Sequence, residues 1–498
     1  MKSSYFRIGK IVFSAAIGMV AFIYALLAAC TYWIFYCYGH VSLWLILAHC
    51  RESPEYLPPG AILSISVSLC LCLVVGLSVA VLTSRMFDLL KKLFSRFGEI
   101  ITVTCSILLC VLIGRELIHW GDVAFNLRLS LQNALGSTHL FSDSAKVVSP
   151  RDITIPVRKN LIVIVSESLE QGFAEGLECD QNIIPDLFDW QLRNYRFLNQ
   201  KQIVGTDYTA GSLMSMFYGI PRIVYITMCL DDLNGDYPRL TIPSIWDVFL
   251  DKGYNCLYCQ GGDFNFASKK NLFPTHERMR LIGKTDLENS PEYVNLQNKP
   301  LYGIQDELTI RRFKRELSDL AFDGKPFFAV LLTLDTHGPY GWCSPSAENR
   351  FKSSVANSVF EQGRLLADLL DWLTRQPYYS DSSVVVLGDH LYWYYNTREV
   401  PDDRVVYNAV KPYNGFTGFG MPSGSVRRHE AFVAFDWAPT FLELAGARLK
   451  DRQFGLGTSL FSESPTLAEQ IGIAELERKL QGSANDFNRV CLRPQKEN

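Results

Sequence analysis

The sequence carries little net charge and has no basic stripe. Its 48 Lys and Arg residues nearly balance its 51 Asp and Glu residues, which leaves a formal net charge of -3. Proteins that bind nucleic acid usually present a concentrated basic face, so no nucleic-acid partner is expected. Internal repeats and low-complexity tracts are also absent, and their absence excludes a solenoid architecture.

What the sequence does contain is an excess of apolar residues near its start. The chain of 498 residues is 48% hydrophobic, with a mean hydropathy of +0.06. Three runs, 11–38, 60–83 and 100–120, each supply the roughly 20 residues that cross a bilayer. The first run is too long for the core of a cleaved signal peptide, and two further runs follow it. Residues 1–120 are therefore predicted to form a three-span membrane anchor.

Cationic residues flank these runs unequally. Lys2, Arg7 and Lys10 precede the first run, and the loop at 39–59 carries only Arg51. The loop between the second and third runs carries four cations: Arg85, Lys91, Lys92 and Arg96. The positive-inside rule then places the N-terminus and this loop in the cytoplasm. With three spans, everything after residue 120 lies on the outer side.

Thirteen cysteines divide between the apolar runs and the rest of the chain. Seven lie in or beside the runs, where thiols are tolerated packing residues. The other six are Cys179, Cys229, Cys256, Cys259, Cys343 and Cys491. Six cysteines allow 15 pairings, and the sequence does not choose among them. Cys256 and Cys259 form a CxxC, but both lie on one predicted strand, which disfavours a metal or redox role.

The chain after the anchor is predicted to form a connector and one large domain. Residues 121–158 are predicted to form an amphipathic connector and linker, and residues 159–498 an α/β domain. Five continuous apolar runs are typical of strands buried on both faces: 160–166, 256–262, 327–335, 383–389 and 431–436. Four helix-like segments lie among them: 241–251, 305–320, 353–375 and 438–445. This alternation predicts a mainly parallel sheet covered by helices.

Polar residues follow four of the predicted strands: Glu167, Gly261-Gly262-Asp263, Asp335 with His337, and Asp389 with His390. Ligands of open parallel sheets collect at the carboxyl ends of the strands. A carboxylate at the end of a buried strand is costly without a positive partner. A divalent cation held by Glu167, Asp389 and His390 would supply that charge, and oxygen with imidazole ligation suits zinc or manganese. A helix cap at Glu167 and an ordinary turn at Asp389 remain the alternatives for each motif alone.

A helix is predicted after Thr209, in the segment TAGSLMSMFY that ends before Gly219. The free N–H groups of a helix start favour an anionic group such as phosphate, and Gly211 would let it approach. Because an alcohol is a poor nucleophile at neutral pH, a metal ion is one standard way to activate it. A plain N-cap is the alternative role of Thr209. Thr206 and Ser212 are weaker candidates, since one precedes the helix start and the other lies inside its first turn.

Several motifs occur in the order found in a known family: NLIVIVSESLE, GTDYTAGSLMSMFYGIP, GGDFNFASKKNLFPTHE, TLDTHGPY, LGDHL and FDWAPTFLELAG with FGLGTSL. The chain resembles the membrane-anchored sulfatase-like transferases of the alkaline phosphatase superfamily. Within them it resembles the phosphoglycerol transferases that modify osmoregulated periplasmic glucans and, less closely, lipoteichoic acid synthase. The resemblance covers roughly 159–460 and the multi-span anchor.

The resemblance implies a covalent two-step reaction at one divalent metal ion, manganese or zinc. Its ligands would be Glu167, Thr209, Asp389 and His390, and Thr209 would also be the nucleophile. Thr209 would attack the phosphorus of phosphatidylglycerol, release diacylglycerol and pass the phosphoglycerol group to a hydroxyl of an envelope glycan. The implied location is a bacterial inner membrane, spanned several times, with the catalytic domain on the periplasmic or extracellular side.

Two further residues match the headgroup pocket of that family. His337 in LDTHGPY would bind phosphate oxygens or move a proton, although a histidine after a strand is often structural. Lys269 in GGDFNFASKK would contact phosphate; otherwise it is a solvated charge.

The sequence departs from neighbouring families near Thr209. It lacks the Cys/Ser-x-Pro-x-Arg setting that sulfatases need, which disfavours sulfate ester hydrolysis, and Ala-Gly follows Thr209 where lipoteichoic acid synthases show a polar stretch. Two rivals stay open: a phosphoethanolamine transferase, and a non-catalytic membrane-anchored binding protein of the same fold. The presence of all four expected metal-site residues disfavours the second. The acceptor stays open as well.

Overall fold

The computed structural model describes residues 11–26, 61–93, 138–222, 239–338, 340–393, 403–418, 424–426 and 428–492, together with 29, 104 and 108. The chain divides into two compact units, Met1–Cys50 with Pro54–Leu131 and Arg51–Ser53 with Gln132–Asn498. Each unit is described by itself.

The first unit contains two described helices, Ile11–Leu26 and α3 (Ala61–Leu93). One segment among the described residues, Ser66–Met86, is long and apolar enough to cross a membrane, with a mean hydropathy of 2.4. The helix Ile11–Leu26 is apolar but shorter. The predicted third span at 100–120 lies almost wholly outside the described residues, so the count of three spans stays a prediction.

Glycines let the two helices of this unit approach closely. A Cβ on Gly18 would lie 2.7 Å from the Gly76 carbonyl oxygen, and a Cβ on Gly76 would lie 2.7 Å from Phe22 Cβ. Small residues at such a crossing are the common device for packing apolar helices.

The second unit is built on an eight-stranded sheet in the order β4-β3-β5-β1-β6-β7-β2-β8. The strands are β1 (Asn160–Ser166), β2 (Tyr195–Phe197), β3 (Asn255–Gln260), β4 (Met279–Ile282), β5 (Phe327–Leu332), β6 (Ser382–Gly388), β7 (Asn408–Lys411) and β8 (Gly424–Val426). Strands β4, β3, β5, β1 and β6 run parallel, whereas β7 pairs antiparallel with β6 and β2. The carboxyl ends of β3, β5, β1 and β6 therefore meet at one edge.

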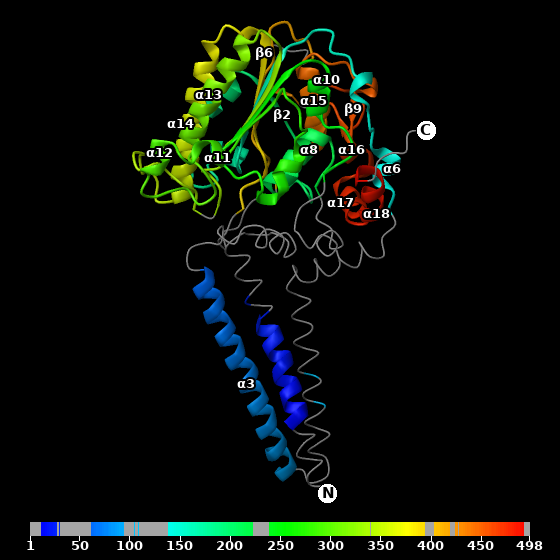
Figure 1. Cartoon of the computed structure of the whole chain (residues 1–498). Coiled ribbons are helices and arrows are strands. Elements are labelled where there is room, and N and C mark those ends of the chain that lie inside the picture. Colours follow the sequence, from blue (N-terminus) through cyan, green and yellow to red (C-terminus); the bar gives the residue numbers. More distant parts are fainter. Residues whose placement is uncertain are drawn as a thin grey trace. The chain divides into compact units, whose positions relative to one another are not determined.

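Helices cover both faces of this sheet. Helices α13 (Asp306–Phe322) and α14 (Ser354–Thr374) lie on one side, and α8 (Thr209–Tyr218), α10 (Ile245–Asp251) and α15 (Trp437–Leu444) lie on the other (Figure 1). The shorter helices are α6 (Leu140–Ser144), α7 (Pro185–Leu192), α11 (Lys284–Leu287), α12 (Pro291–Val294), α16 (Leu467–Ile471), α17 (Ile473–Gln481) and α18 (Ala484–Phe487). The predicted mainly parallel sheet covered by helices is confirmed.

The remaining elements are single turns and a two-stranded sheet of β9 (Gln453–Phe454) and β10 (Gly457–Thr458). The 3-10 turns are η2 (Pro150–Asp152), η3 (Gln171–Ala174), η4 (Phe266–Leu272), η5 (Tyr379–Asp381), η6 (Ala434–Asp436) and η7 (Lys450–Arg452), and η8 (Asn488–Leu492) is a π-helical turn.

The predicted strand at 431–436 is wrong. This run ends in the turn η6 and leads into α15, and Phe432 contributes only an isolated bridge to Gln200. The Asp436 carboxylate accepts hydrogen bonds from Val433 N at 2.8 Å and Thr458 N at 2.8 Å, which caps the turn. A short buried apolar run has the same sequence pattern in a strand and at the start of a buried helix.

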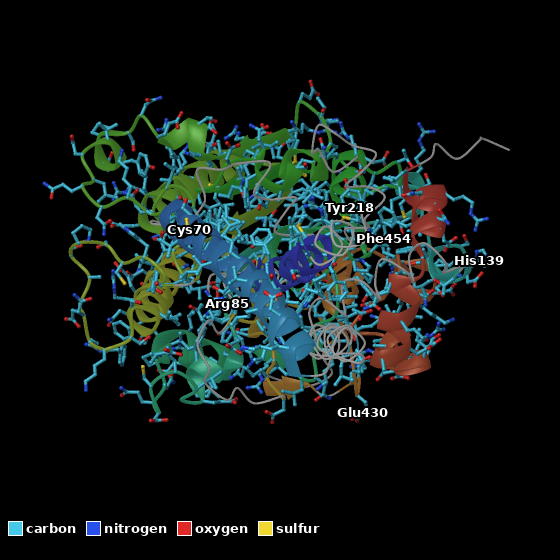
Figure 2. All side chains as sticks on the ribbon, turned by 90° about the horizontal axis from the view of Figure 1, so that it is seen from below. Cys70, Arg85, His139, Tyr218, Glu430 and Phe454 are labelled. Carbon is cyan, nitrogen blue, oxygen red and sulfur yellow. The ribbon has the colours of Figure 1, made fainter. Side chains whose placement is uncertain are left out.

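Helix α8 is fastened at its far end to the β9–β10 segment. Gly219, which ends the helix with φ +69°, accepts a hydrogen bond from Leu456 N at 2.7 Å. A Cβ on Gly219 would lie 2.4 Å from the Phe454 carbonyl oxygen, so only glycine fits there. Tyr218 and Phe454 mark this contact in Figure 2.

Part of the predicted connector packs on the second unit. Leu140, Phe141, Ile153 and Ile155 are buried in its hydrophobic core. The predicted domain boundary at residue 159 stays a prediction.

Candidate active site

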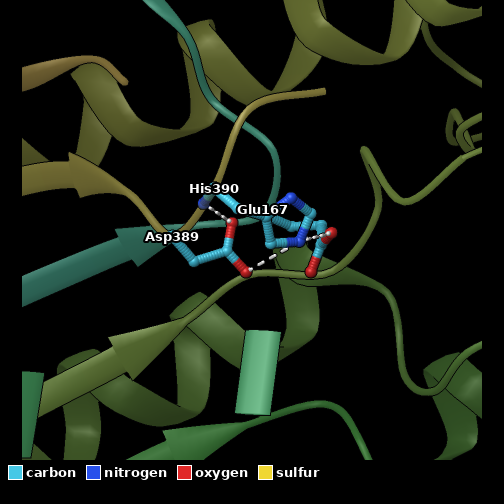
Figure 3. Close-up of side chains that lie close together, drawn as sticks. All are labelled: Glu167, Asp389 and His390. Atoms are coloured by element: carbon cyan, nitrogen blue, oxygen red, sulfur yellow. Dashed lines mark hydrogen bonds and ion pairs between the residues drawn. The ribbon is translucent and has the colours of Figure 1, made fainter. Parts of the chain in front are cut away.

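Two neighbouring strand ends bring three of the predicted ligands together. Glu167 follows β1, and Asp389 and His390 follow β6; the two strands pair with Ser166 opposite Gly388. One ligand atom from each of Glu167, Asp389 and His390 lies within 4.8 Å of the others (Figure 3). All three side chains are buried, with exposed fractions of 1%, 1% and 3%.

Hydrogen bonds orient this cluster but leave acceptor positions open. Asp389 Oδ1 accepts from Ser168 N at 2.7 Å and from His390 N at 2.8 Å. Asp389 Oδ2 is buried and has no hydrogen-bond partner among the described residues, although His390 Nε2 lies 3.5 Å away. His390 Nδ1 lies 2.9 Å from Leu391 O, which assigns the proton to Nδ1 and turns Nε2 toward the carboxylates. Two carboxylates and an imidazole nitrogen that has given up its proton suit zinc or manganese.

The two carboxylates of the cluster stabilise positive charge on His390. Burial raises the pKa of Glu167, but the neighbouring His337 and His390, together with hydrogen bonds from His390 and Ser168, outweigh burial and lower this pKa to about 2. Burial and the Glu167 charge raise the pKa of Asp389 to about 7. Burial lowers the pKa of His390, but Asp389 and Glu167 outweigh it and raise this pKa to about 10. A bound cation would compete with that imidazolium proton.

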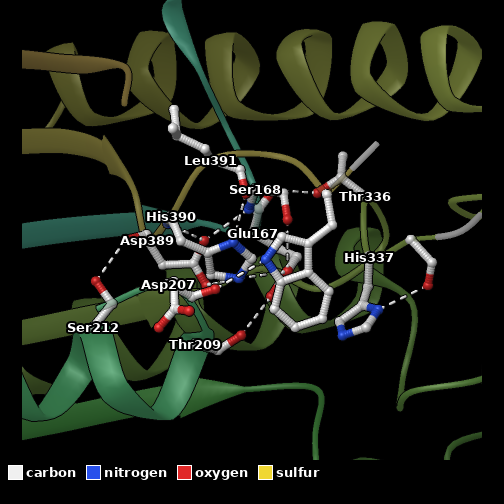
Figure 4. Close-up of polar contacts among 12 residues, drawn as sticks. Glu167, Ser168, Asp207, Thr209, Ser212, Thr336, His337, Asp389, His390 and Leu391 are labelled. Atoms are coloured by element: carbon white, nitrogen blue, oxygen red, sulfur yellow. Dashed lines mark hydrogen bonds and ion pairs between the residues drawn. The ribbon is translucent and has the colours of Figure 1, made fainter. Parts of the chain in front are cut away.

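Thr209 is the first residue of α8, and its hydroxyl faces the cluster. Thr209 Oγ1 donates a hydrogen bond to Glu167 Oε2 at 2.9 Å (Figure 4). The N-cap residue is Tyr208, which makes no side-chain cap, so the side chain of Thr209 is not a simple N-cap. A Cβ on Gly211 would lie 2.5 Å from the Gly205 carbonyl oxygen, so this glycine is needed for the close approach of the preceding loop.

The competing hydroxyls make structural bonds. Thr206 Oγ1 donates to Ile203 O at 2.8 Å, and Ser212 Oγ donates to Asp389 O at 2.5 Å. Among these hydroxyls, Thr209 is the one bonded to a carboxylate of the cluster.

His337 lies beyond the end of β5, on the side of Thr209 away from Asp389 (Figure 4). Its Nδ1 lies 2.9 Å from Gly338 O, and its ring stacks on Tyr302 with centroids 3.8 Å apart. Burial lowers the pKa of His337. A neutral ring with its proton on Nδ1 leaves the Nε2 lone pair available to accept a proton.

Lys269 is held on a strained turn and is not a solvated charge. Its exposed fraction is 4%, and a Cβ on Gly262 would lie 3.5 Å from Lys269 Nζ. The two preceding residues, Ala267 and Ser268, have φ values of +55° and +52°. Each such residue costs about 1–3 kcal/mol, and Arg222 Nη1 stabilises the turn by donating to Ala267 O at 2.7 Å. Strain of this kind clusters at functional sites.

Sequence reasoning missed Trp393, which links both histidines. Its ring stacks on His390 with centroids 5.3 Å apart and lies edge-on to His337 at 6.4 Å. Trp393 Nε1 donates to Asp207 O at 2.9 Å, two residues before Thr209. No local pattern in the sequence marks this tryptophan, because its partners come from three separate strand or loop ends.

Asp335 follows β5 as predicted but does not join the cluster. It pairs with Asp306, whose carboxylate accepts hydrogen bonds from Leu334 N and Asp335 N at 2.8–3.0 Å. Asp306 N donates in return to Asp335 Oδ2 at 2.8 Å. This acid pair braces the loop that carries His337 against the start of α13.

The cysteines play no part in the described site. Cys256 and Cys259 are buried on β3, and burial raises the pKa of both thiols, which makes them unreactive. Cys343 and Cys491 are free thiols, and Cys229 lies outside the described residues.

Comparisons with known proteins agree with this architecture. The family model described as Sulfatase matches residues 159–447. Phosphoglycerol transferase I of Escherichia coli (strain SMS-3-5 / SECEC) is 25% identical over 324 residues, which are 62% of this chain and 40% of that protein. The chain thus spans 40% of the length of the curated relatives it matches.

One solved structure with a TM-score of 0.50 shares the fold. A protein in the alkaline phosphatase superfamily from Vibrio parahaemolyticus is 19% identical, with a TM-score of 0.50 over 67% of this chain and 78% of that chain. The lipoteichoic acid synthase LtaP from Listeria monocytogenes is 18% identical, with a TM-score of 0.45 over 64% and 79%.

Proposed function

This chain belongs to the sulfatase family, and from that premise we propose that it is a membrane-anchored phosphoglycerol transferase. It moves the phosphoglycerol headgroup of phosphatidylglycerol to a hydroxyl of a cell-envelope glycan and releases diacylglycerol. The group is carried in between on Thr209. The relatives named phosphoglycerol transferase I, and the threonine where sulfatases carry their matured Cys or Ser, support this function over sulfate ester hydrolysis.

The single observation that carries the proposal is the bond from Thr209 Oγ1 to Glu167 Oε2 at 2.9 Å. It holds a hydroxyl at the start of a ten-residue helix, beside a buried cluster of acids and a histidine. The free N–H groups of the helix start favour the phosphate of a donor at the same point.

The residues present fit one divalent metal ion, zinc or manganese. The unpartnered, buried Asp389 Oδ2 and the converging atoms of Glu167 and His390 form a set of oxygen and nitrogen donors. Glu167, Asp389, His390 and Thr209 would hold the ion. When bound, it would lower the pKa of the Thr209 hydroxyl and neutralise charge on the phosphoryl group.

Each half-reaction is balanced in protons. In the first, the Oγ1–P bond forms as the bond from phosphorus to the diacylglycerol oxygen breaks; the threonine gives up one proton and diacylglycerol gains one. In the second, the acceptor oxygen bonds to phosphorus and gives up a proton, and the P–Oγ1 bond breaks as Thr209 regains one. The hydrogen bond from Thr209 Oγ1 to Glu167 Oε2 fixes the direction of the attacking hydroxyl.

Lys269 acts on the donor phosphate and His337 on the acceptor hydroxyl. Neutral His337 presents Nε2 to accept the proton of the acceptor hydroxyl, because its Nδ1 is turned to Gly338 O. The buried ammonium group of Lys269 contacts phosphate oxygens, and the strained turn before it fixes its direction.

The proposed location is a bacterial inner membrane. The apolar segment Ser66–Met86 would be one of three spans, with the catalytic unit on the periplasmic or extracellular side, where a lipid donor and an envelope glycan are both accessible.

Mass analysis of the full-length protein after incubation with phosphatidylglycerol tests the proposal. We expect a phosphoglycerol adduct on Thr209, loss of the adduct in Thr209→Ala and retention in Thr209→Ser. Absence of an adduct in the wild-type protein, with diacylglycerol still released, would contradict a threonine intermediate.

The same assay with phosphatidylethanolamine separates the nearest rival. An adduct formed from that lipid and not from phosphatidylglycerol would identify a phosphoethanolamine transferase. Release of no diacylglycerol from either lipid, with metal supplied, would favour the non-catalytic binding protein. Chelation should abolish the adduct, and either zinc or manganese should restore it.

A further inference from the structure

A cleft lies away from the Glu167, Asp389 and His390 cluster. It has a volume of about 540 Å³ and is walled by α13, α14 and the loop at 344–350. None of the three cluster residues lines it. Its volume falls within the range of about 300–1,000 Å³ that is typical of ligand sites.

The charges that line this cleft are balanced. Four cationic and four acidic side chains face it. Arg311 Nη2 lies 3.1 Å from Glu307 Oε1, Arg364 Nη1 lies 3.0 Å from Asp368 Oδ2, and Arg350 also has a carboxylate partner. The arginines are about half exposed. Exposed pairs of this kind contribute about 0–1 kcal/mol each, so the stability of the fold does not explain their concentration here.

This lining suits an uncharged polyhydroxyl ligand better than a phosphate. A guanidinium has five N–H donors and a carboxylate has several acceptor sites, so the paired groups keep both donors and acceptors for a ligand. Each sugar hydroxyl both donates and accepts. The Arg350 guanidinium lies over the half-buried ring of Phe360, 4.6 Å from its centroid, which holds this donor at the cleft.

The cleft wall and His337 belong to one braced segment of chain. Ser344 N donates to Glu361 Oε2 in the cleft at 3.0 Å, and Trp342 N donates to Asp335 O at 2.6 Å. A ligand seated in the cleft therefore contacts the same short segment that carries the headgroup histidine.

We infer that this cleft binds an uncharged stretch of the acceptor oligosaccharide during phosphoglycerol transfer. The inference rests on the proposed function and adds to it a binding site and the chemical class of its ligand.

Calorimetry on the full-length protein in detergent tests the inference. The probes are uncharged glucose hexasaccharides, one α-linked and one β-linked, and hexagalacturonic acid as a charged comparison. We expect at least one uncharged probe to bind, and the double variant Arg311→Ala/Arg364→Ala to bind it at least tenfold more weakly. The charged probe should bind more weakly than the uncharged one.

Helix α14 offers a matched control. Arg375→Ala removes the arginine of another exposed i,i+4 pair, 2.5 Å from Asp371, that does not line the cleft. It should leave binding unchanged. Equal binding by the double variant and the wild-type protein, binding of neither uncharged probe, or tighter binding of the charged probe would each overturn the inference. Labelling of Thr209 from phosphatidylglycerol without any glycan reports on the proposed function separately.

Discussion

Two pairs of buried carboxylic acids lie at the carboxyl edge of one sheet. Glu167 and Asp389 follow β1 and β6, and Asp335, after β5, meets Asp306 at the start of α13. Both pairs are almost fully buried. Their surroundings differ: the first pair faces a histidine and a threonine hydroxyl, whereas the second is bonded mainly to backbone N–H groups.

This difference decides the charge of each pair. The two histidines near Glu167, His337 and His390, keep it ionised, with a pKa of about 2. No histidine is among the described groups that act on the second pair, so burial raises the pKa of Asp306 to about 7, and burial with Asp306 raises that of Asp335 well above its usual range. A buried acceptor atom without a hydrogen-bond partner occurs in both pairs, at Asp389 Oδ2 and at Asp335 Oδ1. Burial of two acids therefore indicates a metal site only where a further ligand such as His390 lies beside them.

The largest expected effect tests whether the hydroxyl beside the first pair is the nucleophile. Thr209→Ala should lower phosphoglycerol transfer by at least about a thousandfold, because the group that carries the intermediate is removed. The measurement is diacylglycerol release from labelled phosphatidylglycerol. Thr206→Ser, which keeps the structural hydroxyl bonded to Ile203, should retain activity within a few-fold. Residual activity of Thr209→Ala near the wild-type rate would remove the reason to assign catalysis to the first pair.

The next largest effect is expected from an Asp-to-Asn substitution in the first pair. The same substitution in the second pair is its control. Asp389→Asn removes a charged ligand atom and should lower transfer by more than about a hundredfold, with loss of bound zinc or manganese. Asp335→Asn should keep metal content and most activity, since the Asp335 carboxylate braces a loop. Metal per chain, measured by elemental mass spectrometry after dialysis, compares the two. Equal metal loss in both variants would erase the distinction drawn between the pairs.

Replacing Trp393, which packs on His390 beside the first pair, should have a smaller effect. Trp393→Phe keeps a ring against His390 but loses the N–H bond to Asp207 O. Partners of this kind typically change metal affinity by about tenfold, and we expect a weakening of that size in a metal titration. Trp372→Phe, on α14, supplies a control for tryptophan replacement. Unchanged metal affinity together with an unchanged transfer rate would leave Trp393 without a positioning role.

The smallest effect is expected in the pH dependence of the protein's stability, to which the second pair contributes. Because burial raises the folded-state pKa of both acids, the pair's contribution to stability is fully present below about pH 4 and is lost as pH rises through these raised pKa values, about 7 for Asp306. Asp335→Asn removes one of the titrating groups, so its Tm should fall less between pH 5 and pH 8 than that of the wild-type protein. The difference should be on the order of 1 kcal/mol, or about 2–3 °C. Asp371→Asn, at an exposed pair, should show the same fall of Tm between pH 5 and pH 8 as the wild-type protein. A larger fall in Asp335→Asn than in the wild-type protein would contradict a raised pKa at the second pair.

The sequence predicted the scaffold of the first pair well because the signal is local. Strands β1, β3, β5 and β6 are largely apolar runs, and a polar residue directly follows β1, β5 and β6. The rule that parallel strand ends share an edge then brings Glu167, Asp389 and His390 together.

The features that the sequence did not predict depend on distant partners. Strands β2, β7 and β8 have three or four residues each and are defined by pairing with one another rather than by a pattern. The run at 431–436 is apolar enough for a strand, yet its own Asp436 caps it into the start of α15. The roles of Trp393 and Asp306 likewise arise from contacts across the fold.

The attachment of the end of helix α8 to the β9–β10 segment bears on the order in which the chain folds during synthesis. Gly219 at the end of α8 is bonded to Leu456, beyond residue 447, where the family match stops. A ribosome makes Thr209 long before it makes Leu456, so a growing chain can carry the nucleophile and all its proposed partners while α8 still lacks its final anchor. If the proposed transfer needs α8 fixed in place, activity should appear only when synthesis has passed the β9–β10 segment.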